Sequence, residues 1–200
     1  MALSTYADLQ ASIASWLARD DLTAYIPDFI TLFEADAARQ LKVRPQATVT
    51  TLTPVNGIAT LPTDYLGYQR VTWTGSPNHD LNYVSPSVWS SFHPADESSN
   101  IPVDFTIEGS SLKIGASNDT AITFSYFQKT AAVSGALNWL YTNHPDAYLF
   151  GSLALAYAFD KDFDKAGLWS GKRDKIFNDI FLLDFNERQG MAIRVLGLTP

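Results

Sequence analysis

The stretch TNHPDAYLFGSLALAYAF, residues 142–159, predicts the helix that organises the fold. Pro145 and Asp146 are typical of a first helical turn, and Asn143 or His144 would be the N-cap. The large side chains that follow face nearly every side of such a helix: Tyr148, Leu149, Phe150, Leu153, Leu155, Tyr157 and Phe159. A helix that is hydrophobic all round lies in the middle of a bundle. We therefore expect other helices to surround it.

Three further helices are predicted, two near the N-terminus and one after the central helix. The first follows an N-cap at Ser4 or Thr5, with Asp8 as the capping partner. The second begins near Pro27 and stops before Pro45. Each of the three has apolar residues at helical spacing. These expected core residues are Leu9, Ile13, Trp16 and Leu17 in the first helix, Ile26, Ile30, Phe33, Ala37 and Leu41 in the second, and Trp169, Ile176, Phe177, Ile180, Phe181 and Leu183 in the last, which spans about 163–186.

The middle of the chain has the pattern of short β-strands. Residues 47–62, ATVTTLTPVNGIATLP, alternate Val and Thr around an Asn-Gly turn, which predicts a hairpin. Residues 68–84 and 103–117 each repeat the strand–turn–strand form, and residues 120–130 predict one more strand. Between them, the polar and proline-punctuated residues 85–102 predict a loop with a short helical turn. About six short strands suffice for a small antiparallel sandwich or barrel.

The sequence therefore predicts an α+β fold in which a β domain is inserted into a helical bundle. An antiparallel bundle of about four helices is expected from residues 1–45 and 130–190, with the β domain at 46–129. Antiparallel flanking helices would bring the ends of the insertion close together. A short apolar tail remains at residues 191–200, MAIRVLGLTP.

The negative net charge of the chain is unfavourable for binding nucleic acid. The net charge is −7, and the densest basic cluster, Lys172-Arg173-Lys175, is diluted by Asp174 and Asp179, so it is expected to be a solvated helix face. The chain has no cysteine, which excludes disulfides, thiolate catalysis and cysteine zinc sites. The sequence has no run of 18 consecutive apolar residues, so we expect no membrane span. The N-terminus does not have the pattern of a secretory signal.

The candidate catalytic and metal-binding patterns all lack their diagnostic residues. The histidines, His79, His93 and His144, fall in separate segments, and neither G-x-S-x-G nor H-E-x-x-H occurs. The His-Pro-Asp triplet at His144 has no basic helix before it, as a J-domain would require. Asp160 begins a run resembling a calcium loop, but the sixth and twelfth positions hold Lys165 and Gly171. We expect no catalytic residue, metal ligand or cofactor, and a helix cap at Asp162.

Several quoted segments together resemble the head-to-tail adaptor proteins of short-tailed bacteriophages. Residues 2–41 are similar to the N-terminal helices of that family, and IATLPTDYLGYQRVTW, residues 58–73, is similar to its hairpin. The most specific segment is NWLYTNHPDAYLFGSLALAYAF, residues 138–159, followed by the tryptophan-bearing helix LWSGKRDKIFNDI, residues 168–180. The resemblance covers nearly the whole chain in the same order, although no single motif is chemically diagnostic.

The resemblance implies a structural virion protein, not an enzyme. Such adaptors form a ring, usually dodecameric, beneath the portal, extend the DNA channel and carry the tail nozzle. The implied partners are the portal protein, the nozzle or tail-tube proteins, neighbouring copies of the chain and double-stranded DNA in passage, with no membrane. The implied location is the head–tail junction of the virion, and the host cytoplasm during assembly. An acidic wall suits a DNA conduit because like charges keep the duplex from adhering.

The apolar tail is the expected portal contact, because it cannot easily bury itself in a finished bundle. Docking as an added strand or extended arm is expected through Met191, Ile193, Val195, Leu196 and Leu198. Packing of the tail on its own subunit is the alternative. The neutral loops of the β domain are expected to face the tail or a neighbouring subunit.

Two other functions remain open from the residues alone. A cell-wall hydrolase would need a pair of carboxylates or a nucleophile–base pair in a cleft, but the glutamates Glu34, Glu97, Glu108 and Glu187 form no recognisable pair. A glycan-binding tail protein would need exposed aromatic side chains. The candidates for such a groove are Trp73, Tyr83, Trp89 and Phe92, for which burial in the core or an interface is the alternative.

Overall fold

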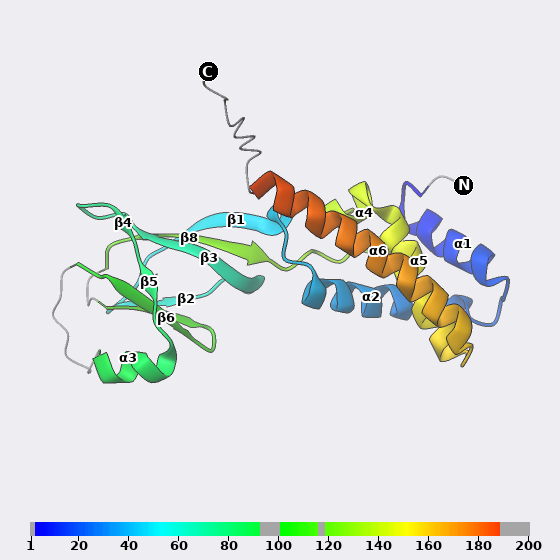
Figure 1. Ribbon diagram of the computed structural model, residues 1–200, viewed down its shortest axis with the longest axis horizontal. Helices are drawn as coiled ribbons and strands as arrows, with labels where there is room; N and C mark the ends of the chain where they lie inside the picture. Colours follow the sequence, from blue (N-terminus) through cyan, green and yellow to red (C-terminus); the bar gives the residue numbers. More distant parts are fainter. Residues whose placement is uncertain (1–2, 93–100, 116–118, 189–200) are drawn as a thin grey trace, which may run out of the picture. The chain divides into compact units, whose positions relative to one another are not determined.

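The computed structural model describes residues 3–92, 101–115 and 119–188, and shows an α+β chain with six α-helices and two four-stranded sheets in those ranges (Figure 1). The chain divides into two compact units. One consists of residues 1–45 and 130–200 and the other of residues 46–129. We refer to them as the helical unit and the β unit. None of the described helices is long and apolar enough to cross a membrane.

The helical unit is built around one buried helix. Its helices are α1 (Tyr6–Leu17), α2 (Ile26–Gln40), α4 (Trp139–Asn143), α5 (Pro145–Phe159) and α6 (Phe163–Arg188). Helix α5 packs against each of the other four. The most buried residues of α5 are Ala147, Leu153 and Ala156, together with Tyr148 and Ser152. The predicted central helix is therefore confirmed, and its small residues allow its neighbours to approach closely.

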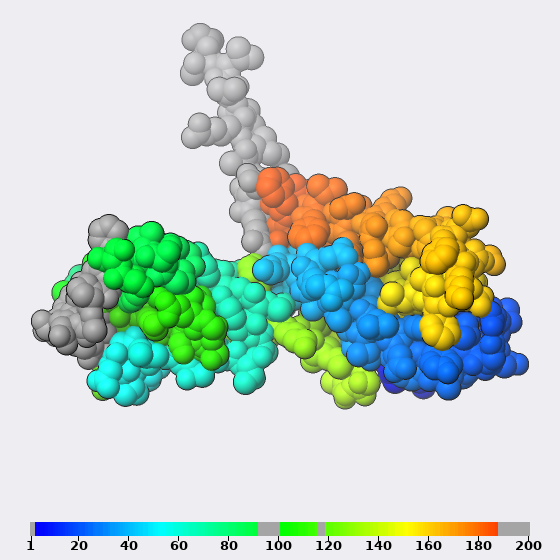
Figure 2. All heavy atoms as spheres, turned by 90° about the horizontal axis from the view of Figure 1, so that it is seen from below, coloured from blue at the N-terminus to red at the C-terminus, as the bar shows by residue number. Residues whose placement is uncertain are grey.

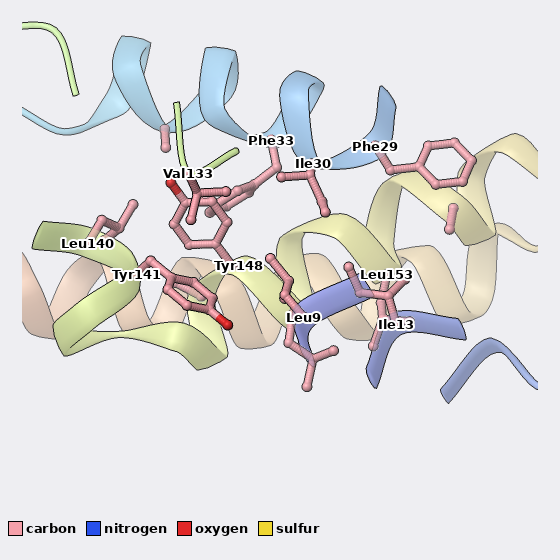
Figure 3. Close-up of a cluster of buried hydrophobic side chains, with 14 of the residues drawn as sticks. Leu9, Ile13, Phe29, Ile30, Phe33, Val133, Leu140, Tyr141, Tyr148 and Leu153 are labelled. Carbon is pink, nitrogen blue, oxygen red and sulfur yellow. The ribbon is translucent and has the colours of Figure 1, made fainter. Parts of the chain in front are cut away.

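The core of the helical unit joins side chains from distant parts of the chain (Figure 3). The five apolar positions predicted for the second helix are all buried. Phe33 of α2 lies edge-on to Tyr148 of α5, with ring centroids 4.8 Å apart. Gly151 follows on the same helix, and a Cβ atom there would lie 2.0 Å from Cδ2 of Phe33. Gly151 is thus the position at which α5 admits the Phe33 ring.

A buried polar network fixes the segment that precedes α5. Tyr148 donates a hydrogen bond to Glu34 Oε1 at 3.1 Å and accepts one from Asn138 Nδ2 at 2.7 Å. Asn138 also caps α4, because its Oδ1 accepts from the Tyr141 backbone N–H at 2.9 Å. Burial is the main cause that raises the pKa of Tyr148, and the charge of Glu34 adds to it. The Tyr148 hydroxyl therefore remains a donor at neutral pH.

The helix ends confirm two of the predicted caps. Thr5 Oγ1 accepts from the Asp8 N–H at 3.1 Å, and the Asp8 carboxylate accepts from the Thr5 N–H at 3.0 Å, which completes a capping box. Asp162 accepts from the Lys165 N–H at 3.1 Å where α6 begins. His144 is the N-cap of α5 but its side chain makes no capping hydrogen bond. The short helix α4 is an element that the sequence patterns did not predict.

The capping box predicts how the stability of the helical unit depends on pH. Hydrogen bonds from Ser4 and Thr5 lower the pKa of Asp8 below its ordinary value. Asp8 therefore contributes stability above its unfolded-state pKa of about 3.9, and this contribution is lost as pH falls through the folded-state pKa. In urea unfolding, Thr5→Ala should cost about 1 kcal/mol at pH 7. The deficit of Asp8→Ala should shrink toward pH 3, whereas an unchanged deficit would contradict this role.

The β unit contains eight described strands in two sheets. The first sheet has the order β1–β8–β3–β4 and contains β1 (Ala47–Leu52), β3 (Tyr65–Trp73), β4 (His79–Asp80) and β8 (Ile122–Gln128). The second has the order β2–β7–β6–β5 and contains β2 (Ile58–Thr60), β5 (Asn82–Tyr83), β6 (Asp104–Glu108) and β7 (Ser111–Ile114). Helix α3 (Pro86–Phe92) is the predicted helical turn. The pairing is antiparallel except between β5 and β6. Residues from both sheets form one buried cluster, including Val71, Phe124, Phe105 and Leu112.

The predicted hairpin at residues 47–62 is wrong in its pairing. Asn56 and Gly57 do form the turn, with positive φ angles of 51° and 75°, and it closes a bridge between Val55 and Ile58. However, β1 pairs with β8 and β2 pairs with β7, so the two strands belong to different sheets. Pro54 between them has no N–H to donate to a continuous ladder. The hairpin of β3 and β4 and that of β6 and β7 are confirmed.

Candidate assembly surfaces

Of the two described histidines, His79 has a ring held by backbone carbonyl groups. The ring nitrogens of His79 lie 3.0 Å from the Pro77 carbonyl oxygen and 2.6 Å from that of Pro102. These two carbonyls raise the pKa of His79, since they favour the ring with both nitrogens protonated. His144 lies between α4 and α5, and His93 is outside the described residues. Among the residues described, no three His, Asp or Glu side chains are grouped to hold a metal ion.

The aromatic residues proposed for a glycan groove are divided by the fold. Trp73 and Trp89 are buried, so for them the core alternative holds. Tyr83 is exposed and stacks on Tyr68 with ring centroids 5.2 Å apart. The Phe92 side chain is outside the described part of the structure. Two of the four candidates are therefore unavailable to line a surface groove.

The largest departure from the predicted core is at the end of α6. Phe181 and Leu183, which helical spacing placed toward the core, are 40% and 60% exposed. Leu182 and Phe185 beside them are 59% and 58% exposed. We call these four residues the α6 end patch. The last turns of α6 lie on the surface of the helical unit, in orange and red in Figure 2. A helix end that is apolar on several faces is expected to be covered by a partner.

Backbone and charged contacts hold the α6 end in place. Asp184 accepts a hydrogen bond from the Arg44 backbone N–H at 2.7 Å, and the Arg44 guanidinium pairs with Glu187. These contacts lie on the side of α6 that faces the segment after α2. Charged groups therefore tie one side of the helix end to its own subunit. Three residues of the α6 end patch come before Asp184, and Phe185 lies between Asp184 and Glu187.

A hollow of about 150 Å³ adjoins the α6 end patch. It is lined by Leu183 of the patch and by Val43, Pro45, Trp139, Asn143, His144, Ile180, Asp184 and Glu187. The apolar residues in this set come from α4, α6 and the segment after α2. A side chain from a partner that contacts the patch could insert here, so the two features form one candidate surface.

The other half of α6 carries a compact group of aromatic and cationic side chains. Trp169 lies 5.3 Å from Trp16 and 5.4 Å from Phe150, measured between ring centroids. The Lys172 ammonium lies 4.3 Å from the Trp169 ring centroid. Trp16, predicted to be core, is in fact half-exposed. This group packs α1, α5 and α6 together while leaving part of its surface open.

The predicted solvated basic face is wrong for Arg173. Its guanidinium donates to Asp36 of α2 at 2.9 Å and to Asp174 at 2.7 Å, and its side chain is 15% exposed. Arg173 therefore links α6 to α2 instead of standing free in solvent. Lys172 and Lys175 are exposed, as predicted.

The predicted portal-contact residues lie outside the part of the chain that the structure describes. They are Met191, Ile193, Val195, Leu196 and Leu198. The sequence contained a signal for the α6 end patch that the helical pattern concealed. Phe181, Leu182 and Leu183 are consecutive, and no single face of a helix can bury three consecutive residues.

Comparison with known proteins gives one family. A family model described as SU10 adaptor protein matches residues 4–195. The match includes both described units and extends past the end of α6. No curated protein matches the chain.

Proposed function

We propose that this chain joins the portal of the head to the tail as a ring, because it belongs to the SU10 adaptor protein family. The members of that family are phage head–tail adaptors. The family supports a structural role at the head–tail junction of the virion. The finer proposal is a dodecameric ring beneath the portal that extends the DNA channel and carries the tail nozzle. Assembly would take place in the host cytoplasm.

The α6 end patch is the observation that supports a partner on the portal side. Its four apolar side chains are 40–60% exposed, and residues 189–200, which include the apolar tail, follow α6 in the sequence. The patch and the apolar tail would then form one continuous docking surface for the portal. A ring also requires two different patches on each subunit, since its contacts are heterologous. The group around Trp16 and Trp169 is a candidate for a separate contact with a neighbour.

The net charge of −7 supports the proposed conduit. Double-stranded DNA is densely negative, so an acidic wall binds it weakly and allows it to pass. The described lysines and arginines are partly engaged within the fold, as Arg44, Arg19 and Arg173 are by carboxylates. The chain is therefore proposed to guide DNA by repulsion.

Removal of the tail tests the proposed portal arm. Deleting residues 191–200 should weaken binding to the portal ring at least tenfold, because it removes Met191, Ile193, Val195, Leu196 and Leu198. The fold of the truncated chain should remain, as judged by circular dichroism and thermal melting. The measurement is sedimentation with the portal ring. Unchanged binding by the truncated chain would show that residues 191–200 are not the portal contact.

The proposed function as a whole is tested in the phage. Infection with a mutant that lacks this chain should yield heads that have packaged DNA but carry no tail. Supplying the chain in trans should restore tailed particles. Electron microscopy of purified particles distinguishes these states. Tailed, infectious particles formed without the chain would contradict the adaptor role.

A further inference from the structure

Strand β1 is the longest sheet edge in the described part of the β unit. It has six residues, Ala47–Leu52, and pairs only with β8 in the sheet order. The other edge strands are shorter: three residues in β2 and two each in β4 and β5. The β1–β8 register is continuous, with no bulge along its length. An edge of this kind offers a row of backbone groups to another strand.

The ladder contacts identify which backbone groups of β1 face outward. The Leu81 N–H donates to the Val71 carbonyl, so the backbone N–H and C=O of Val71 point to β4. Those of its neighbour Thr72 therefore point to β8. Thr72 is opposite Thr123, so the backbone groups of Thr123 in β8 point to β3. The backbone groups of the next residue, Phe124, point to β1. In the same way the Ala121 carbonyl accepts from Thr74, on the β3 side. Alternation along β8 therefore directs Ile122, Phe124 and Tyr126 to β1.

The partners of those three residues in β1 are Leu52, Thr50 and Thr48. Their N–H and C=O groups make the internal ladder. The groups of the alternating residues Ala47, Val49 and Thr51 consequently point away from the sheet. Within the described residues, no hydrogen bond is recorded for these outward groups. Val49 is also 64% exposed, so solvent reaches the middle of the strand.

Strand β1 has none of the features that normally protect an edge. Its sequence, ATVTTL, contains no charged residue and no proline, and four of its six residues are β-branched. Natural edge strands are commonly blunted by lysine, proline, a bulge or short length. The absence of charge also means that two copies of β1 would not repel each other.

We propose that β1 is an interaction edge, and that β1 of a second copy of this chain occupies it in antiparallel pairing about a two-fold axis at Val49. In this register Val49 is opposite its own counterpart, and Ala47 is opposite Thr51. Every outward residue then faces another outward residue, so each pair exchanges both of its backbone hydrogen bonds. A shift by one residue would oppose outward groups to groups already used in the β1–β8 ladder. This pairing joins two copies of the free chain and does not depend on the proposed adaptor role.

The absence of native cysteine allows a direct crosslinking test. Val49→Cys places its two sulfurs across the axis, where Cα atoms of a hydrogen-bonded pair are about 5.5 Å apart. That spacing is within the range of a disulfide. Thr51→Cys is the matched control, because its two copies would be four residues apart along the strands, about 13 Å. The double variant Ala47→Cys/Thr51→Cys should crosslink, since these two positions are opposite each other.

Mild oxidation followed by non-reducing electrophoresis is expected to give a dimer band for Val49→Cys and for the double variant, at least fivefold stronger than for Thr51→Cys. Light scattering of the unmodified chain should show a mass of about 44 kDa at high concentration, twice the 22.1 kDa of one chain. Val49→Pro should shift this mass to one chain, since it removes an outward N–H and leaves the β1–β8 ladder intact.

Three results would overturn the proposal. The first is the mass of a single chain at every concentration up to about 1 mg/ml. The second is equal crosslinking of Val49→Cys and Thr51→Cys. The third is an oligomer that keeps its mass when Val49 is replaced by proline. The crosslinking comparison holds even if Val49→Pro folds poorly. A failure here leaves the portal-binding experiments unaffected, because they measure a different surface.

Discussion

Replacement of Gly151 by alanine is expected to destabilise the helical unit by about 1–3 kcal/mol, because the new methyl group would overpack the core. The added Cβ would lie 2.0 Å from Cδ2 of Phe33, and this ring is buried between Tyr148 and Phe177. The ring cannot move away without disturbing α2, α5 or α6. Thermal and urea unfolding of the purified chain measure the loss.

Gly171 provides the matched control on α6. A Cβ atom there would meet nothing within 4 Å, so Gly171→Ala should instead stabilise by roughly 0.5–1 kcal/mol through helix propensity. Removing the ring with Phe33→Ala should cost about 3–5 kcal/mol on its own. In that background Gly151→Ala should become neutral or stabilising. If Gly151→Ala were as stabilising as Gly171→Ala in the unmodified chain, the close packing of α2 and α5 would be wrong.

Charge placed in the α6 end patch is expected to abolish portal binding with little effect on folding. Leu182 and Phe185 are 59% and 58% exposed, so aspartate at both positions remains solvated in the free chain. In the proposed complex the two carboxylates would be buried in an apolar contact. Hot-spot residues each contribute at least about 2 kcal/mol, so the double variant Leu182→Asp/Phe185→Asp should weaken binding at least about 100-fold.

A pair of exposed leucines outside the patch supplies the control for this effect. Leu168 lies on the other half of α6 and Leu32 lies on α2, and both are exposed. The double variant Leu168→Asp/Leu32→Asp introduces the same charge outside the α6 end patch. It should bind the portal ring within about threefold of the unmodified chain. Equal loss of binding in both double variants would indicate a general charge effect and would reject the patch as the portal contact.

The sequence predicted the elements that depend on local patterns. The all-round apolar residues of 145–159 predicted the central helix, and Thr5 with Asp8 predicted the capping box. Prediction failed where the outcome depends on what lies alongside an element. Helix α6 has 26 residues and its main partner α5 has 15, so helical spacing could not reveal that Phe181 and Leu183 lie beyond the packed part.

The strand pairing could not be predicted for a related reason. The Asn56-Gly57 turn forms as its sequence requires. The choice of partner for β1, however, depends on β8, whose paired residues lie 70–80 positions later in the chain. The local alternation of Val and Thr does not reveal which strand pairs with β1. The signal available for the candidate surface was the run of three consecutive apolar residues from Phe181. The predicted burial of Phe181 and Leu183 within the subunit was wrong.

The most direct test of the adaptor account is the mass of the complex between this chain and the portal ring of the same phage. The two purified proteins are mixed and separated by size, and light scattering gives the mass of each species. The account predicts a complex with one copy of this chain for each portal subunit, and its loss with Leu182→Asp/Phe185→Asp. A portal ring that elutes without this chain, at concentrations where both proteins are folded, would contradict the account.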